Sequence, residues 1–193
     1  MRLKGTHLMS TNAVLEKSPT PDVVGEVNAD GILVGGPGWG VHQVSQKMVA
    51  TDPVLLRAVM DRTDNPLNKV GCAIALGALD EARGYLAQSP DTMRKKIFTG
   101  DVLREEGRYV EAARHFTLLL DEARGTVHEA VVLQHHGKSL FLEGRYGEAV
   151  RYLTDALAGL RADGRDVMAV KYTELCLGEA RRRIEAERAG ADA

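Results

Sequence analysis

Apolar residues follow a helical spacing from Asp52 towards the end of the chain. Asp52 and Pro53 are a helix-capping residue and a proline at the first helical position, and Leu55, Ala58 and Val59 then fall on one helical face. The same spacing continues between later breaks made of glycine, proline and capping residues. The pattern therefore predicts helices over this part of the chain.

The breaks divide this region into eight expected helices joined by short turns. Asn65-Pro66 separates the first two helices, and Gly107 and Gly144 fit the glycine that often follows the last residue of a helix. After the first helix, the expected helices cover residues 66–76, 79–87, 92–106, 109–124, 127–143, 146–162 and 166–188. Short connections of this kind are typical of antiparallel helix pairs.

Residues 1–47 have a different character. They are rich in glycine and proline, most densely at residues 35–40, and this density opposes regular helix. We expect a flexible or weakly structured leader, with Met9 as an alternative natural start. A short hairpin with strands at 23–27 and 31–34 is the alternative, although an isolated hairpin is only marginally stable. At the other end, residues 189–193 are expected to be a short tail.

Two segments of the chain repeat each other 37 residues apart. Residues 107–114 read Gly-Arg-Tyr-Val-Glu-Ala-Ala-Arg, and residues 144–151 read Gly-Arg-Tyr-Gly-Glu-Ala-Val-Arg. A weaker copy at residues 77–83 precedes the first by 30 residues. Gly100 and Gly137 lie seven residues before the two good copies, where they allow a second helix to approach closely. Self-similarity at such a period indicates stacked supersecondary units.

These segments resemble the tetratricopeptide repeat (TPR) family, whose units are helix–turn–helix pairs of about 34 residues. The residues that match are small residues of the first helix, tyrosines of the turn and small residues of the second helix: Gly100, Gly137, Tyr109, Tyr146, Ala112 and Ala149. Lys96 and Leu133 stand where the family pattern has an aromatic residue, and the closing proline is absent. The resemblance covers about residues 62–163. A helical bundle with accidental similarity is the alternative.

The resemblance implies an all-α fold. Residues 52–188 would form a right-handed α-solenoid of about three TPR-like helix pairs, with residues 166–188 as a capping helix and a flexible N-terminal leader in front. In this family the concave surface is formed mainly by the first helix of each pair. The candidate partner-binding residues carried onto that surface are Arg94, Ile97, Asp101, Arg104, Gln134, Lys138 and Phe141. The alternative interpretation of the same residues is a solvated helix face together with core residues such as Ile97 and Phe141.

The implied groove has mixed polarity and is slightly basic, which suits a peptide of some acidic character. The leading hypothesis is therefore a protein–protein interaction adaptor, or scaffold, that holds a peptide segment or a protein surface in the groove. A regulatory or sensor domain for a small peptide or ligand is the second hypothesis. The third is an accessory subunit whose leader, around Trp39, inserts into a partner enzyme; Trp39 could equally anchor the leader on the protein's own helices.

Composition and charge limit the partners and the cellular location that we expect. The chain has 193 residues and a formal net charge of −2, so no overall field attracts nucleic acid or an acidic membrane. Its apolar runs are far too short to cross a bilayer, and no signal peptide is evident. Cys72 and Cys176 fit no ligand spacing and are expected to be buried, reduced thiols. We expect a cytoplasmic protein with no nucleic-acid or membrane partner, and a homodimer if the apolar stripe of the last helix is left uncovered.

No pattern of residues indicates catalysis, a cofactor or a metal. Neighbouring carboxylates such as Glu105 and Glu106 point apart on a helix, and no serine lies in a nucleophile elbow. His135 and His136 would point about 100° apart, so they are poorly placed to share an ion. We expect His136 to face the partner helix and His135 to face solvent. The glycine run at 35–40 lacks a phosphate-binding motif, so the chain is predicted not to be an enzyme.

Overall fold

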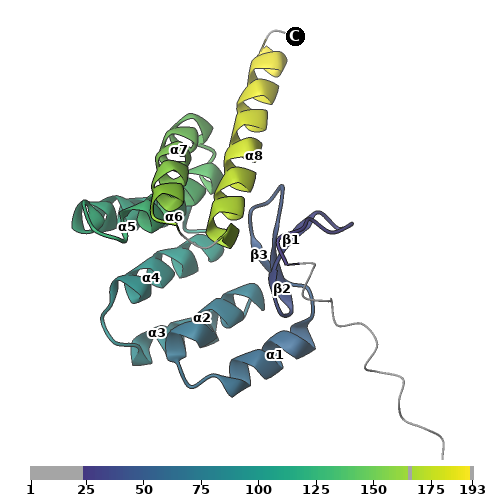
Figure 1. Ribbon diagram of the computed structural model, residues 1–193, viewed down its shortest axis with the longest axis vertical. Helices are drawn as coiled ribbons and strands as arrows, with labels where there is room; N and C mark the ends of the chain where they lie inside the picture. The colour runs from purple at the N-terminus through teal and green to yellow at the C-terminus, as the bar shows by residue number, and fades with distance from the viewer. Residues whose placement is uncertain (1–23, 165–166, 192–193) are drawn as a thin grey trace, which may run out of the picture.

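The computed structural model describes residues 24–164 and 167–191, which form eight helices and one three-stranded sheet (Figure 1). The strands are β1 (Ile32–Gly36), β2 (Trp39–His42) and β3 (Met48–Ala50). The helices are α1 (Pro53–Arg62), α2 (Pro66–Ala75), α3 (Leu79–Gln88), α4 (Met93–Glu105), α5 (Tyr109–Ala123), α6 (Glu129–Leu142), α7 (Tyr146–Ala162) and α8 (Val167–Ala191).

The predicted helices are present, and their ends lie close to the predicted breaks. The first two begin at the expected caps, since the side chains of Asp52 and Asn65 accept hydrogen bonds from the amides of Leu55 and Leu67, both at 2.9 Å. The last helix is longer than expected. It continues to Ala191, through most of the segment that was predicted to be a tail.

The expectation of a mostly helical fold is confirmed, but residues 32–50 form strands where an all-α fold with a flexible or weakly structured leader at residues 1–47 was expected. β1, β2 and β3 form an antiparallel sheet in that order, and the glycine run supplies the tight β1–β2 turn, with Gly38 at φ 76°. The alternative hairpin is present in part, because the amide of Gly25 donates to the carbonyl of Val34 at 2.9 Å. The sheet forms because the helices provide a surface on which it packs. The local sequence pattern of residues 24–50 does not predict that surface. Residues 1–23 of the predicted leader lie outside the described residues.

Three helix pairs share one turn geometry. Gly77, Gly107 and Gly144 each adopt a positive φ, and the amide of the next residue donates to a carbonyl five residues back: Ala78 to Ala73, Arg108 to Leu103 and Arg145 to Leu140. This is the Schellman arrangement, which satisfies the last carbonyls of a helix. The two strong copies also share an ion pair: Arg108 binds Glu111 and Arg145 binds Glu148 through two nitrogens each. The repeat in the sequence is thus a repeat in space.

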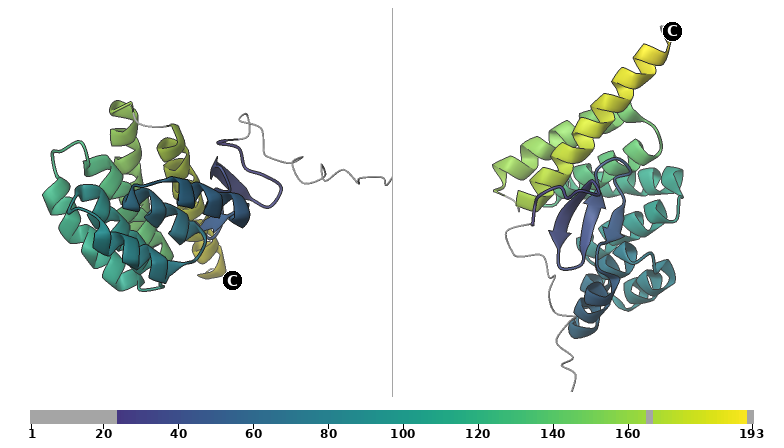
Figure 2. Two further views of the ribbon diagram at one scale, coloured as in Figure 1. Left: turned by 90° about the horizontal axis from the view of Figure 1, so that it is seen from below. Right: turned by 90° about the vertical axis from the view of Figure 1, so that its right-hand side faces the viewer.

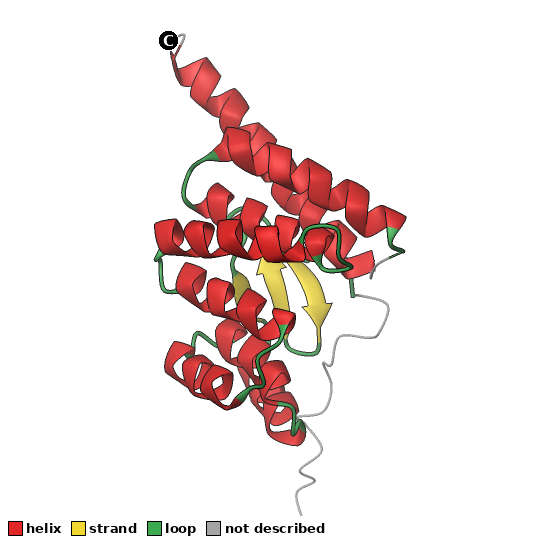
Figure 3. Ribbon diagram, turned by 90° about the vertical axis from the view of Figure 1, so that its left-hand side faces the viewer, coloured by secondary structure: helices red, strands yellow, loops and turns green. Residues whose placement is uncertain are grey.

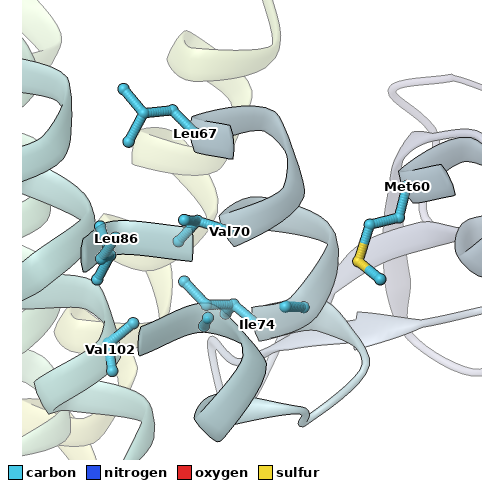
Figure 4. Packing of buried hydrophobic residues seen from close by; sticks show 8 residues of the cluster. Met60, Leu67, Val70, Ile74, Leu86 and Val102 are labelled. Carbon is cyan, nitrogen blue, oxygen red and sulfur yellow. The ribbon is translucent and has the colours of Figure 1, made fainter. Parts of the chain in front are cut away.

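In two of the three pairs the helices approach closely at a glycine. A Cβ added to Gly137 would lie 2.7 Å from Leu153 Cγ, and one added to Gly100 would overlap the ring of Phe116. In the first pair Val70 and Leu86 occupy the corresponding positions, in a cluster with Met60, Ile74 and Val102 (Figure 4). The first pair therefore tolerates a valine where the other two require glycine.

The helices stack in chain order from α1 to α8, and the sheet lies against one side of the stack (Figures 1 and 2). β2 and β3 contact α2. At the other end the ring of Trp39 lies 6.1 Å from that of Tyr172 in α8, and Lys171 Nζ donates to the Gly25 carbonyl at 2.8 Å. When the left-hand side of Figure 1 faces the viewer, the helices lie in front of the sheet (Figure 3). The sheet thus bridges the two ends of the helical stack.

The close approach at Gly137 predicts a large difference between two glycine-to-alanine substitutions. Gly137→Ala should lower the free energy of unfolding by about 1–3 kcal/mol, because the new methyl group collides with Leu153. Gly84→Ala in α3 is the matched control: an added Cβ there meets nothing within 4 Å, and the helix gains up to about 1 kcal/mol. Urea unfolding of the two variants measures the difference. Equal effects would contradict close packing at Gly137.

Candidate functional site

A cavity of about 380 Å³ lies between the sheet and the helices. Its walls come from β2, β3, α1, α2, α4, α6, α7 and α8. The residues that line it are Trp39, Val41, Gln46, Met48, Leu56, Asn68, Gly71, Cys72, Arg94, Phe98, Asp101, Arg104, Gln134, His135, Lys138, Leu153, Tyr172 and Cys176. Segments from both ends of the chain are therefore needed to form one site.

The first helices of the three pairs contribute residues at equivalent positions. Asn68, Phe98 and His135 form one set, and Gly71, Asp101 and Lys138 form a second set one helical turn further on. The members of each set are 30 and then 37 residues apart, as are the three turn glycines. The repeated architecture therefore directs the same positions of α2, α4 and α6 into the cavity.

A buried ionic cluster joins α4 to α6. Asp101 Oδ1 lies 2.7 Å from Arg104 Nη1 and 2.7 Å from His135 Nδ1, and Arg104 Nε lies 3.5 Å from a Glu105 oxygen. Asp101 is 2% exposed and Arg104 is 1% exposed. Burial alone would raise the pKa of Asp101, but the charge of Arg104 and the contact with His135 hold it well below its usual range. Asp101 is therefore ionised and fixes the position of both partners.

Lys138 is the unusual charge of the site. Within the described part of the chain its ammonium group has neither an ion pair nor a hydrogen bond, although it lines the cavity beside the cluster. Burial lowers the pKa of Lys138 to about 8; the nearby charge of Arg104 acts in the same direction, and the carboxylates of Glu105 and Asp101 act against it. The side chain is still mostly protonated at neutral pH, so the cavity contains a cation without a counter-ion from the protein.

The remaining walls are mainly apolar and aromatic. Trp39 packs on Tyr172, and the guanidinium of Arg94 lies 5.4 Å from the centre of the Phe98 ring. Arg94 also donates to Asn68 Oδ1 at 2.8 Å. Arg94 and Asn68 are exposed, so the cavity opens to solvent beside them.

The sequence-predicted site residues separate into two groups. The cavity brings together Trp39, Arg94, Asp101, Arg104, Gln134 and Lys138. Ile97 and Phe141 instead lie in hydrophobic clusters, where they are 7% and 5% exposed. This agrees with the alternative interpretation, in which both are core residues. Gln134 is already engaged, because its amide nitrogen donates to the Ala169 carbonyl at 2.8 Å and to Thr173 Oγ1 at 2.7 Å. It serves to tie α6 to α8.

Several residues of the cavity were not predicted from the sequence. His135 was expected to face solvent, which is wrong, because it turns towards Asp101 and is only 24% exposed at the side chain. Phe98 was not singled out, although it precedes His135 by the repeat spacing of 37 residues. Tyr172 and Cys176 come from the last helix, which has no repeat partner from which their role could be read. The cysteines are free thiols, Cys176 buried and Cys72 half-buried.

His136 lies on the other side of α6, against the second helix of its pair as predicted. Its ring makes an edge contact with Tyr152 at 4.4 Å between centres, and its Nδ1 is buried without a hydrogen-bond partner within residues 24–164 and 167–191. Burial lowers the pKa of His136 to about 4, and the charge of Arg145 acts in the same direction. The two adjacent histidines therefore lie in unrelated environments.

Over the described ranges, no three or more His, Cys, Asp or Glu side chains are grouped as metal ligands would be. In the same ranges every helix is too short or too polar to cross a membrane. Comparison with protein-family models, with curated proteins and with solved structures finds no match to this chain.

The unpaired charge of Lys138 predicts that removing it stabilises the fold. Because the folded-state pKa is about 8 against an ordinary 10.5, the folded protein binds the proton less tightly than the unfolded chain does. Lys138→Met should therefore raise the free energy of unfolding at pH 7 by on the order of 1–3 kcal/mol. Urea unfolding measures the change.

Two controls accompany this measurement. The gain should shrink as the pH rises from about 8 to 10.5, where the wild-type protein gains stability while the unfolded lysine still holds its proton. Lys47→Met, at an exposed position, should change little. Destabilisation by Lys138→Met at pH 7 would contradict the assignment of Lys138 as an uncompensated charge.

His136 predicts a loss of stability in mild acid. Its pKa is about 4 when folded and 6.5 ordinarily, so the unfolded chain binds the extra proton as the pH falls from about 6.5 to 4. Stability should decrease over this window by on the order of 3 kcal/mol, and His136→Leu should remove that part of the slope. His128→Gln, at an exposed histidine, should retain it. Thermal unfolding between pH 7 and pH 4 provides the comparison, and an unchanged slope in His136→Leu would refute the prediction.

Proposed function

We propose that this chain is a regulatory domain that binds a small molecule in the cavity between its helices and its N-terminal sheet. The cavity of about 380 Å³ is the observation that carries the proposal. This volume is near the lower end of the range for small-molecule sites, and mostly apolar walls with a few convergent polar groups are typical of such sites.

We further propose that α2 to α7 are three TPR-like units of a right-handed solenoid, with α8 as the capping helix. The shared turn geometry at Gly77, Gly107 and Gly144 supports this interpretation, as does the close approach at Gly100 and Gly137. On this view the cavity occupies the concave side, which is where the family presents its ligands.

The sensor hypothesis fits the position of the polar residues better than the adaptor hypothesis does. Asp101 and Arg104 are almost completely buried, so a peptide lying on the surface would not reach them. A small molecule, by contrast, would contact Trp39 in β2 and Tyr172 in α8 at the same time. Binding would then strengthen the attachment of the sheet to the helices, which is how a ligand could change what the domain offers to a partner.

The site supports binding rather than chemistry. Burial raises the pKa of Cys176 to about 12, so its sulfur is a protonated thiol and a weak nucleophile. Asp101 is held by Arg104 and His135, and a carboxylate engaged in this way is a poor proton acceptor. These groups position one another and leave the centre of the cavity to a ligand.

Octanol is a suitable neutral probe for the cavity, and Trp39, the only tryptophan of the chain, reports on it. We expect a saturable change in tryptophan emission with a dissociation constant of about 0.1–1 mM, the range that a ligand of this size reaches through apolar contact. Gly71→Met should abolish the change, because Gly71 lines the cavity and its new side chain would fill it.

Gly84→Met is the matched control for this experiment. It places the same side chain in a helix at an exposed glycine, and it should bind octanol as the wild-type chain does. A linear, non-saturating response in the wild-type chain, or equal binding by both variants, would refute the proposed function.

A further inference from the structure

The charged side chains that line the cavity carry more positive than negative charge. Arg94, Arg104 and Lys138 are cationic, whereas Asp101 is the one carboxylate among the described lining residues. Asp101 is already committed to Arg104 and His135 at 2.7 Å each. Glu105 compensates Arg104 only in part, since the nearest distance is 3.5 Å. An anion is therefore the missing component of the site.

Two nitrogens on neighbouring helices are available to that anion. Lys138 Nζ, from α6, has no acceptor among the residues that the structure describes. Arg104 Nη1, from α4, is buried; it lies 2.7 Å from Asp101 Oδ1 in an ion pair and has no second acceptor among the described residues. Arg104 is buried and Lys138 is partly exposed. Burial removes water from both charged donors, which is costly, and a bound anion would lower this cost.

The apolar walls exclude a bare inorganic anion as the natural occupant. Most of the lining consists of side chains such as Trp39, Met48, Leu56, Phe98 and Leu153. A hydrated inorganic ion would leave these walls in contact with water, whereas a hydrocarbon body would cover them. The volume of about 380 Å³ equals roughly a dozen water molecules, so the body must be short.

We propose that the ligand of this cavity is a small amphipathic carboxylate. Its head group would accept hydrogen bonds from Lys138 and Arg104, and its hydrocarbon body would lie against Trp39 and Phe98. This inference rests on the proposed function, because it assigns a chemical class to the ligand of the same cavity.

The test compares three probes that differ only in the head group: octanoate, octanol and octylammonium. Their dissociation constants are measured at pH 7 by Trp39 emission and by isothermal titration calorimetry. We expect octanoate to bind at least about tenfold more tightly than octanol, because a charge-assisted hydrogen bond replaces a neutral one. Octylammonium should not bind, since its charge would face Lys138 and Arg104.

Variants of Lys138 test whether its side chain causes the preference for octanoate over octanol. Lys138→Met should reduce the affinity for octanoate by about tenfold or more while binding of octanol is kept, which also shows that the cavity remains folded. Lys138→Arg should retain the preference for octanoate, and Lys47→Met should behave as the wild-type chain does.

The outcomes separate this inference from the proposed function. If octanol and octanoate bind equally, or if Lys138→Met keeps the preference for octanoate, the cavity binds small molecules but the assignment of a carboxylate is wrong. If sodium phosphate displaces octanoate completely at equal concentration, the site recognises the anion alone and the amphipathic class is wrong. If none of the three probes binds, the proposed function itself fails.

Discussion

The close approach of the two helices in each pair is the constraint on which the rest of the structure depends. At Gly100 and Gly137 the second helix packs where a side chain would otherwise stand. This contact sets the position of each first helix relative to its neighbours, so that equivalent residues of α2, α4 and α6 face the same side. The cavity therefore depends on the packing between the two helices of a pair, and Leu153, which contacts Gly137, is also part of its wall.

The N-terminal sheet completes what the helices begin. Asp101, Arg104 and His135 line a cavity whose walls also include β2 and β3, where little water screens their mutual attraction. The sheet and the helices together thus form a cavity with defined donors and a defined size.

The helices could be predicted from the sequence because their signals are local. Capping residues, turn glycines and the spacing of apolar positions all lie within one or two helical turns of the boundaries that they mark. Six of the eight candidate residues line one cavity, and five of them come from the repeat helices α4 and α6. Ile97 and Phe141 share the spacing of these five but sit at the edge of the helix face, where each turns into the core.

The sheet and its role could not be predicted in the same way. Residues 35–40 contain so much glycine that they favour no regular structure by themselves, and their strands exist because Leu56 and Tyr172 offer surfaces from distant parts of the chain. His135 was misplaced for a related reason. A helical pattern indicates which residues share a face of one helix. It does not indicate that the carboxylate of Asp101, from another helix, lies opposite His135.

The contact between the sheet and the last helix has a consequence for the order of folding. Lys171 binds the carbonyl of Gly25 across 146 positions of the chain. A ribosome therefore releases the sheet long before it releases the helix against which the sheet rests, whereas each helix pair can form as soon as it emerges. The helix pairs can therefore form first, and the cavity is completed only on chains whose synthesis has reached α8.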